Sequence, residues 1–267
     1  MLAFASVLCF LPMSCGKTDD EDEKNAVTID DYGDGIIFGI KGVSFNMRKI
    51  YGGTFQMGTT LEDDDQAFNE ETVVHNVTLS NYYIGETEVT QALWDKVAGN
   101  NPSHFSGASL PVERVSYDMI TQKFIPVLNN LTGKTFRLPT EAEWEFAAKG
   151  GNDATGYRYS GSNDASEVSW HNGNSQNQTH SVKSKRCNEQ YLYDMSGNVW
   201  EWCQDWHGLY SDTAQTNPQG PATGQFRIVR GGAWSDGVRY SRTTCRMRYL
   251  PGAQNHFLGF RLAMNAD

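Results

Sequence analysis

Apolar and polar residues alternate in two stretches of the first third of the chain. In the first stretch Val43, Phe45 and Met47 are separated by polar residues, and the glycine-rich segment 52–58 follows. The second stretch covers residues 73–84. A period of two places side chains on opposite faces of a β-strand, and glycine permits tight turns. The pattern therefore predicts a hairpin from about residue 43 and a further strand over 73–84.

The middle third changes to a helical pattern. A short helix is predicted over 90–98, because the glycine and proline of 99–102 end it. A longer helix is predicted over 116–131, where apolar residues share one face. Pro126 lies inside this helix and lacks a backbone donor, so a kink or a break is expected there.

A third helix begins after Pro139, where Thr140 and Glu143 have the spacing of a capping box. From residue 150 to 190 periodicity is weak and Gly, Asn and Ser are frequent, which predicts a long irregular region. The pattern thus predicts short strands, a few short helices and a long irregular segment.

Composition supports one compact domain. The chain has 267 residues, of which 39% are hydrophobic and 12% aromatic, enough for one substantial core. The 26 glycines, 7 tryptophans and 12 tyrosines favour many turns around aromatic packing. The formal charge of −10 argues against nucleic acid and anionic membrane surfaces as partners, because both would repel the protein.

The N-terminus resembles a lipoprotein signal. Residues 1–14 are apolar but too short to span a membrane, and Ser14 precedes Cys15 and Gly16. We expect a signal peptide over 1–14 and lipidation of Cys15; an ordinary secretory signal with an incidental cysteine is the alternative. Residues 15–40, which begin with an acidic run, are expected to form a polar tether. From the lipidation signal and the acidic run we expect an outer-membrane or cell-surface location. Membrane contact would be through the lipid anchor only.

Cysteine and arginine are the residues most open to interpretation. Cys187, Cys203 and Cys245 follow Cys15, so in an oxidising compartment two of the three could pair. No CxxC or HExxH motif is present, which argues against structural zinc. Arginine is the usual choice for buried ion pairs, so a group near the C-terminus is expected to pair with internal carboxylates. These are Arg239, Arg242, Arg246, Arg248 and Arg261.

Six ordered sequence blocks resemble the formylglycine-generating enzyme (sulfatase-modifying factor) family. The most specific is YDMSGNVWEW at 193–202. The others are GGTFQMG at 52–58, ETEVT at 86–90, RLPTEAEWE at 137–145, RGGAW at 230–234 and GFRLA at 259–263. The resemblance implies a single compact α+β family domain over 41–267, with a C-type-lectin-like core, little regular secondary structure and a few short helices.

The resemblance also implies one structural calcium site. Asp194 and Glu201 would supply carboxylate oxygens, and Gly197 and Val199 would supply backbone carbonyls, which suits the hard Ca²⁺ ion. The alternative interpretation is a tight turn in which a buried Glu201 pairs with arginine. The family's other calcium site has no matching ligands between residues 168 and 189.

The cysteine pair that binds Cu(I) in active family members has no counterpart at the matching positions. Counted from Gly232, those positions are Asp236 and Ser241, and Ala233 replaces the serine of the family motif. Cu(I) selects soft thiolates over hard oxygen ligands, so neither copper nor oxidase activity is expected. The family fold also brings the regions of Cys203 and Cys245 together, which implies a disulfide between them and a free Cys187.

Two functions remain open. The first is a surface or envelope lipoprotein that holds a glycan, a peptide or an envelope protein on a lectin-like scaffold without catalysis. The second is an active sulfatase-activating oxidase, or another enzyme of the same superfamily. The missing cysteine pair favours the first.

Overall fold

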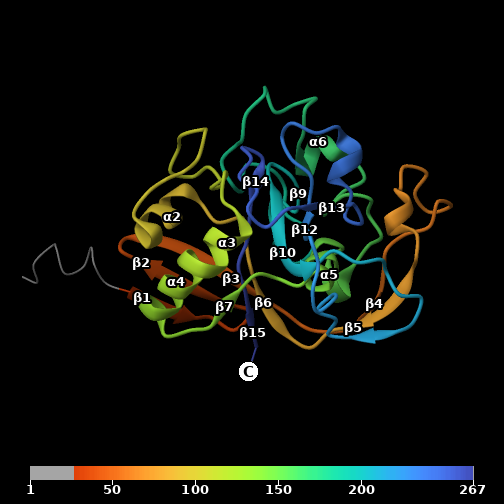
Figure 1. Cartoon of the computed structure of the whole chain (residues 1–267), viewed down its shortest axis with the longest axis horizontal. Coiled ribbons are helices and arrows are strands. Elements are labelled where there is room, and N and C mark those ends of the chain that lie inside the picture. Colours follow the sequence, from red (N-terminus) through yellow and green to blue (C-terminus); the bar gives the residue numbers. More distant parts are fainter. Residues whose placement is uncertain (1–26, 267) are drawn as a thin grey trace, which may run out of the picture.

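The structure, a computed structural model, describes residues 27–266 (Figure 1). Its largest sheet has six antiparallel strands in the order β1-β2-β3-β6-β15-β7. The strands are β1 (Val27–Asp31), β2 (Gly35–Ile40), β3 (Val43–Ile50), β6 (Tyr82–Gly85), β15 (Ala263–Asn265) and β7 (Phe136–Arg137). The C-terminal strand β15 thus lies between β6 and β7, which joins the two ends of the domain in one sheet.

The hairpin β1–β2 corrects the expected boundary of the tether. Phe38 and Ile40 are fully buried, and β2 pairs with β3 along its whole length. Phe38 stacks on Phe45 with ring centroids 5.1 Å apart. Residues 27–40 therefore belong to the folded domain, because the apolar run of β2 supplies core side chains despite the acidic segment that precedes it. Residues 1–26, which include the expected signal peptide and Cys15, lie outside the described residues.

Helices α2 (Gln91–Ala98), α3 (Tyr117–Met119) and α4 (Ile125–Thr132) lie beside the six-stranded sheet, and α2 and α4 pack on it (Figure 1). A π-helical turn, Ile120–Phe124, separates α3 from α4. The irregularity expected at Pro126 takes the form of this π-helical turn, while the backbone stays helical through it; Pro126 is the second residue of α4, where its missing N–H matters least. Trp94 of α2 stacks on Phe124 at 4.9 Å and joins these helices in the first part of the core.

Helix α5 (Glu141–Ala148) is buried along its whole length and organises the other half of the molecule. It packs between a three-stranded and a four-stranded sheet. The predicted capping box is present, because Thr140 accepts from the Glu143 N–H and Glu143 accepts from the Thr140 N–H. The first sheet has the order β11 (Gln215–Thr216), β5 (His75–Thr78), β4 (Thr54–Met57). The second has the order β13 (Arg246–Tyr249), β12 (Arg227–Arg230), β10 (Trp200–Trp206), β14 (Leu258–Gly259).

The region 150–190 is mainly irregular, as predicted. It contains one turn of 3₁₀-helix at Gly151–Asp153, the short helix α6 (Ala165–Val168) and the strand β8 (Ser169–Trp170). β8 pairs with β9 (Ser196–Gly197) and so fixes the loop against the 194–201 turn. Two more 3₁₀ turns lie at Asn69–Glu71 and Val238–Ser241.

Candidate functional site

The positions that carry the family's chemistry are held by internal hydrogen bonds. Asp236 Oδ2 accepts from Trp200 Nε1 at 2.7 Å, and burial raises the pKa of this carboxyl. Ser241 is fully buried at the end of the Val238–Ser241 turn, and its Oγ accepts from Ser169 Oγ at 2.9 Å. Ala233 is also fully buried and has no side-chain donor. Neither a thiolate nor a free hydroxyl with an adjacent base is present here.

The expected Cys203–Cys245 disulfide is wrong, because both cysteines are free. Cys203 lies on β10 and Cys245 directly precedes β13, and β12 runs between these two strands. Adjacent strands are about 4.8 Å apart, so strands on either side of a third are roughly 9.6 Å apart. A disulfide requires Cα atoms within about 7 Å. Cys187, the cysteine expected to be free, is unpaired and half-buried.

Burial also makes the two core thiols poor metal ligands. It raises the pKa of Cys245 to about 12 and that of Cys203 well above its ordinary range. The thiolate is the form that binds soft metals, so burial disfavours metal binding by both residues.

The predicted calcium ligands lie on one tight turn, where Asp194 and Val199 also make hydrogen bonds within the chain. Asp194 Oδ2 accepts from the Lys183 N–H at 2.9 Å, and burial raises the pKa of Asp194 to about 6. The N–H of the fully buried Val199 donates to Glu88 Oε1 at 3.3 Å. Gly197 has φ +81°, and a Cβ there would lie 2.3 Å from the Trp170 carbonyl oxygen, so only glycine fits this turn.

Glu201 is occupied by other partners. Its Oε2 accepts from Arg261 Nε at 2.5 Å and from Trp144 Nε1 at 2.7 Å, and its Oε1 accepts from Arg261 Nη2 at 2.6 Å. Glu201 and Arg261 are both fully buried. This buried pair with arginine is the arrangement that the alternative interpretation of the turn predicts. Within residues 27–266 no group of three or more His, Cys, Asp or Glu side chains could hold a metal ion. Calcium binding by Asp194, Glu201 and the carbonyls of Gly197 and Val199 stays a prediction.

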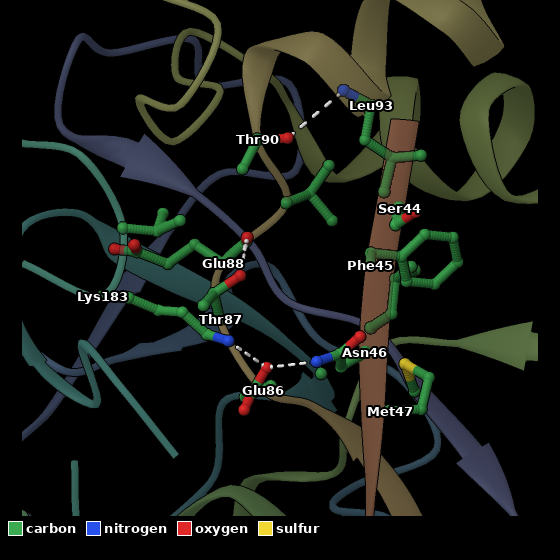
Figure 2. A pocket seen from close by; sticks show the side chains of 14 residues that line it. Ser44, Phe45, Asn46, Met47, Glu86, Thr87, Glu88, Thr90, Leu93 and Lys183 are labelled. Carbon is green, nitrogen blue, oxygen red and sulfur yellow. Dashed lines mark hydrogen bonds and ion pairs between the residues drawn. The ribbon is translucent and has the colours of Figure 1, made fainter. Parts of the chain in front are cut away.

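A small cavity of about 150 Å³ lies beside this turn and is shown in Figure 2. Glu86 lies between Asn46 and Lys183, because its Oε2 accepts from Asn46 Nδ2 at 2.7 Å and pairs with Lys183 Nζ. The neighbouring Glu88 accepts from Val199 N and from Asn198 Nδ2, and burial raises its pKa well above the ordinary range. The polar groups of this cavity are thus satisfied within the chain. Sequence reasoning missed the role of Glu88, although it lies in the ETEVT block.

The C-terminal arginines pair with internal carboxylates, with one exception. Arg242 donates to Glu71 and Asp64, Arg246 to Glu141, Arg248 to Glu70, and Arg261 to Glu201. Arg239 donates instead to the backbone carbonyls of Gln66 and Ala67 and lies over the Phe68 ring.

The core also contains the pair Arg230–Glu145, both fully buried. Burial raises the pKa of Glu145, but Lys149 and Arg230 outweigh it and hold this pKa below its ordinary value.

A partly exposed aromatic face lies next to the family's catalytic positions. It consists of Phe105, Trp234, Tyr249, His256 and Phe257. Consecutive rings lie 5.4–5.9 Å apart: Phe105 to Trp234, Trp234 to His256, His256 to Phe257, and Phe257 to Tyr249. His256 is exposed, Phe105, Tyr249 and Phe257 are half-buried, and Trp234 is buried beneath them with 7% of its surface exposed. Trp234 follows Ala233 directly, so the loop that carries the catalytic chemistry in the family supplies part of this face.

Glu113 fixes the loop that carries Phe105. Its Oε1 accepts the backbone N–H groups of His104 at 2.5 Å and Phe105 at 2.9 Å. Its Oε2 is buried without a hydrogen-bond partner, and burial raises the pKa of Glu113 to about 7. A fixed loop presents Phe105 at low entropic cost, which favours binding.

Several known proteins are similar to this chain in sequence and in fold. Residues 45–266 match the sulfatase-modifying factor enzyme 1-like (FGE-sulfatase) domain. The chaperone protein LppX of Paenibacillus barcinonensis is 35% identical over 245 residues, which cover 73% of this chain and 81% of that protein. The formylglycine-generating enzyme of Streptomyces coelicolor is 29% identical over 289 residues, covering 82% and 89%.

Solved structures agree with the sequence comparisons. Treponema denticola variable protein 1 superposes with a TM-score of 0.77 at 33% identity, covering 90% of this chain and 99% of the other. The expected C-type-lectin-like α+β fold is thereby confirmed. Within residues 27–266, no helix has the length and apolar character needed to cross a membrane. The chain belongs to the formylglycine-generating enzyme (sulfatase-modifying factor) family.

Proposed function

We propose that this protein is an exported, lipid-anchored binding module of the outer membrane or cell surface that has the family fold without its oxidase chemistry. The observation that carries the proposal is the state of the two catalytic positions. Asp236 and Ser241 are hard-ligand residues engaged by Trp200 and Ser169, and the nearest sulfur in sequence, Cys245, is a buried thiol. A Cu(I) centre needs soft sulfur ligands that this site does not offer.

The aromatic face supports a binding role. Aromatic side chains bury large areas with few rotatable bonds, so they are favoured at the centres of recognition surfaces. Phe105, Trp234 and His256 come from separate loops that the fold assembles, and His256 adds a polar group. The ligand classes that fit such a face are a glycan, a peptide or an envelope protein. Relatives named as a chaperone and as a variable protein are compatible with binding without catalysis.

A copper and turnover assay tests the absence of oxidase activity. The purified protein is titrated with Cu(I) and incubated under air with a sulfatase-derived cysteine peptide, and the Streptomyces coelicolor enzyme serves as the positive control. We expect no stoichiometric copper binding and no conversion of the peptide by mass spectrometry. Copper binding together with loss of the peptide thiol would establish the alternative, an active oxidase.

A binding assay tests the aromatic face. The labelled protein and a His256→Ala, Phe105→Ala variant are applied to glycan and peptide arrays and to purified envelope proteins. We expect a ligand that the wild type binds and the variant binds at least tenfold more weakly. Equal binding by both proteins would place recognition elsewhere.

The lipid anchor is tested separately. A Cys15→Ser variant should lose incorporation of a labelled fatty acid and leave the membrane fraction. Retention of the label would assign lipidation to another residue.

A further inference from the structure

A second, larger cavity lies between the loop after β10 and the start of α5. Its volume is about 540 Å³, within the range of roughly 300–1,000 Å³ typical of small-ligand sites. Trp206, Leu209, Tyr210 and Pro218 form much of its wall. It shares no lining residue with the aromatic face or with the calcium turn, so its occupant is independent of the function proposed above.

The charged groups of this cavity are paired, with one exception. Glu141 accepts from Arg246 Nε at 2.8 Å and from Arg246 Nη2 at 2.7 Å. Arg246 Nη1 donates to the Gly208 carbonyl at 2.9 Å, so each nitrogen of the guanidinium already has a partner. An anionic ligand would therefore find no free cation among these side chains.

Asp205 is the exception. It is only 4% exposed, and its Oδ2 accepts from the Glu141 N–H at 2.9 Å at the start of α5. Its Oδ1 accepts no hydrogen bond within the described part of the chain and lies beside Gly220, which also lines the cavity. Although the residue is buried, Oδ1 is not among the fully buried side-chain atoms that lack a partner, so this atom stays accessible from the cavity and can accept from a ligand that enters it.

A second acceptor faces the same space. His75 is 5% exposed and its Nδ1 contacts the Val73 carbonyl at 3.1 Å. A carbonyl only accepts, so Nδ1 carries the hydrogen, and in the neutral ring Nε2 is an acceptor. The cavity thus offers acceptors within apolar walls, on a protein whose formal charge is −10.

We propose that this cavity binds an organic cation, a primary ammonium group attached to an apolar body, with Asp205 as its counter-ion. The ammonium donates to Asp205 Oδ1 and the apolar body packs against Trp206 and Leu209. An ammonium has donors only, which matches the acceptors Asp205 Oδ1 and His75 Nε2.

The protonation of Asp205 gives a direct readout. Burial raises the pKa of Asp205 to about 8, with the negative charge of Glu141 adding to the shift. The other charged groups that face Asp205 are Glu143, Arg246 and Arg227. At pH 6.5 the empty site holds a protonated Asp205, and pairing with an ammonium ionises it, so binding releases up to about one proton per ligand.

Calorimetry with 2-phenylethylamine and its neutral analogue 2-phenylethanol tests the proposal. We expect the amine to bind at least tenfold more tightly, and Asp205→Asn to abolish that preference. The asparagine keeps an oxygen for the Glu141 N–H, so the variant preserves the start of α5. The matched control is Asp63→Asn, an exposed acid that lines a different cavity of about 530 Å³, and it should leave the affinity unchanged.

Two further measurements keep the test decisive. In the wild type, titration of the amine in buffers of different ionisation enthalpy should reveal proton release at pH 6.5. A short peptide with a free N-terminus, compared with its acetylated form, distinguishes a peptide source of the ammonium from a free amine. Equal affinity for amine and alcohol, or amine binding without proton release, would overturn the proposal.

Discussion

Replacing Glu201 by glutamine tests whether the 194–201 turn is held by an ion pair or by a metal. Glu201 and Arg261 are both 0% exposed, and Arg261 donates both to Glu201 and to the carbonyls of Gly85 and Tyr193. The substitution removes the carboxylate that is hydrogen-bonded to this buried guanidinium. Breaking one partner of such a pair costs about 3–5 kcal/mol.

This cost converts to a change in melting temperature. For a domain of about 240 described residues, 1 kcal/mol corresponds to roughly 2–4 °C. We therefore expect Glu201→Gln to melt roughly 6–20 °C below the wild type in a calorimetric scan. The matched control is Glu167→Gln, whose pair with Arg186 is exposed and should contribute about 0–1 kcal/mol.

The same scan with a chelator separates the two interpretations. If the ion pair holds the turn, the difference between wild type and Glu201→Gln persists in excess EDTA. If Glu201 acts through calcium, EDTA lowers the wild type to the melting point of the variant and leaves the variant unchanged. That outcome, or a loss below about 1 kcal/mol, would refute the reasoning from the ion pair.

Three further predictions address the core. Phe38→Ala should lower the free energy of unfolding by about 3–5 kcal/mol in a denaturant titration. A near-neutral effect would show that residues 27–40 do not contribute to the core. Glu145→Gln should destabilise the protein at pH 7. Because the pKa of Glu145 lies below its ordinary value, its contribution is present above the unfolded pKa and is lost as pH falls through the folded pKa. Melts between pH 7 and 3 should show the difference shrinking toward acid. Cys203 and Cys245 should both react with a thiol reagent after unfolding without reductant, and protection of either would indicate a disulfide.

The elements that sequence alone predicted are those encoded within a few residues. The capping box of Thr140 and Glu143, the irregularity at Pro126 and the family blocks each depend on neighbours along the chain. The composition, rich in glycine and aromatic residues, also indicated many turns and little regular secondary structure. The acidic run after Cys15 led to a wrong prediction of the tether's end at residue 40, because the apolar strand β2 lies within the segment assigned to the tether.

Only the tertiary structure decided which distant groups meet. The strand order places β12 between Cys203 and Cys245, which prevents the disulfide, and it brings Arg261 to Glu201 across 60 residues. The free oxygen of Asp205 likewise depends on how the loop after β10 meets α5. Whether a charge is paired depends on every group packed around it. The strand order, and not the spacing along the chain, decides which groups those are.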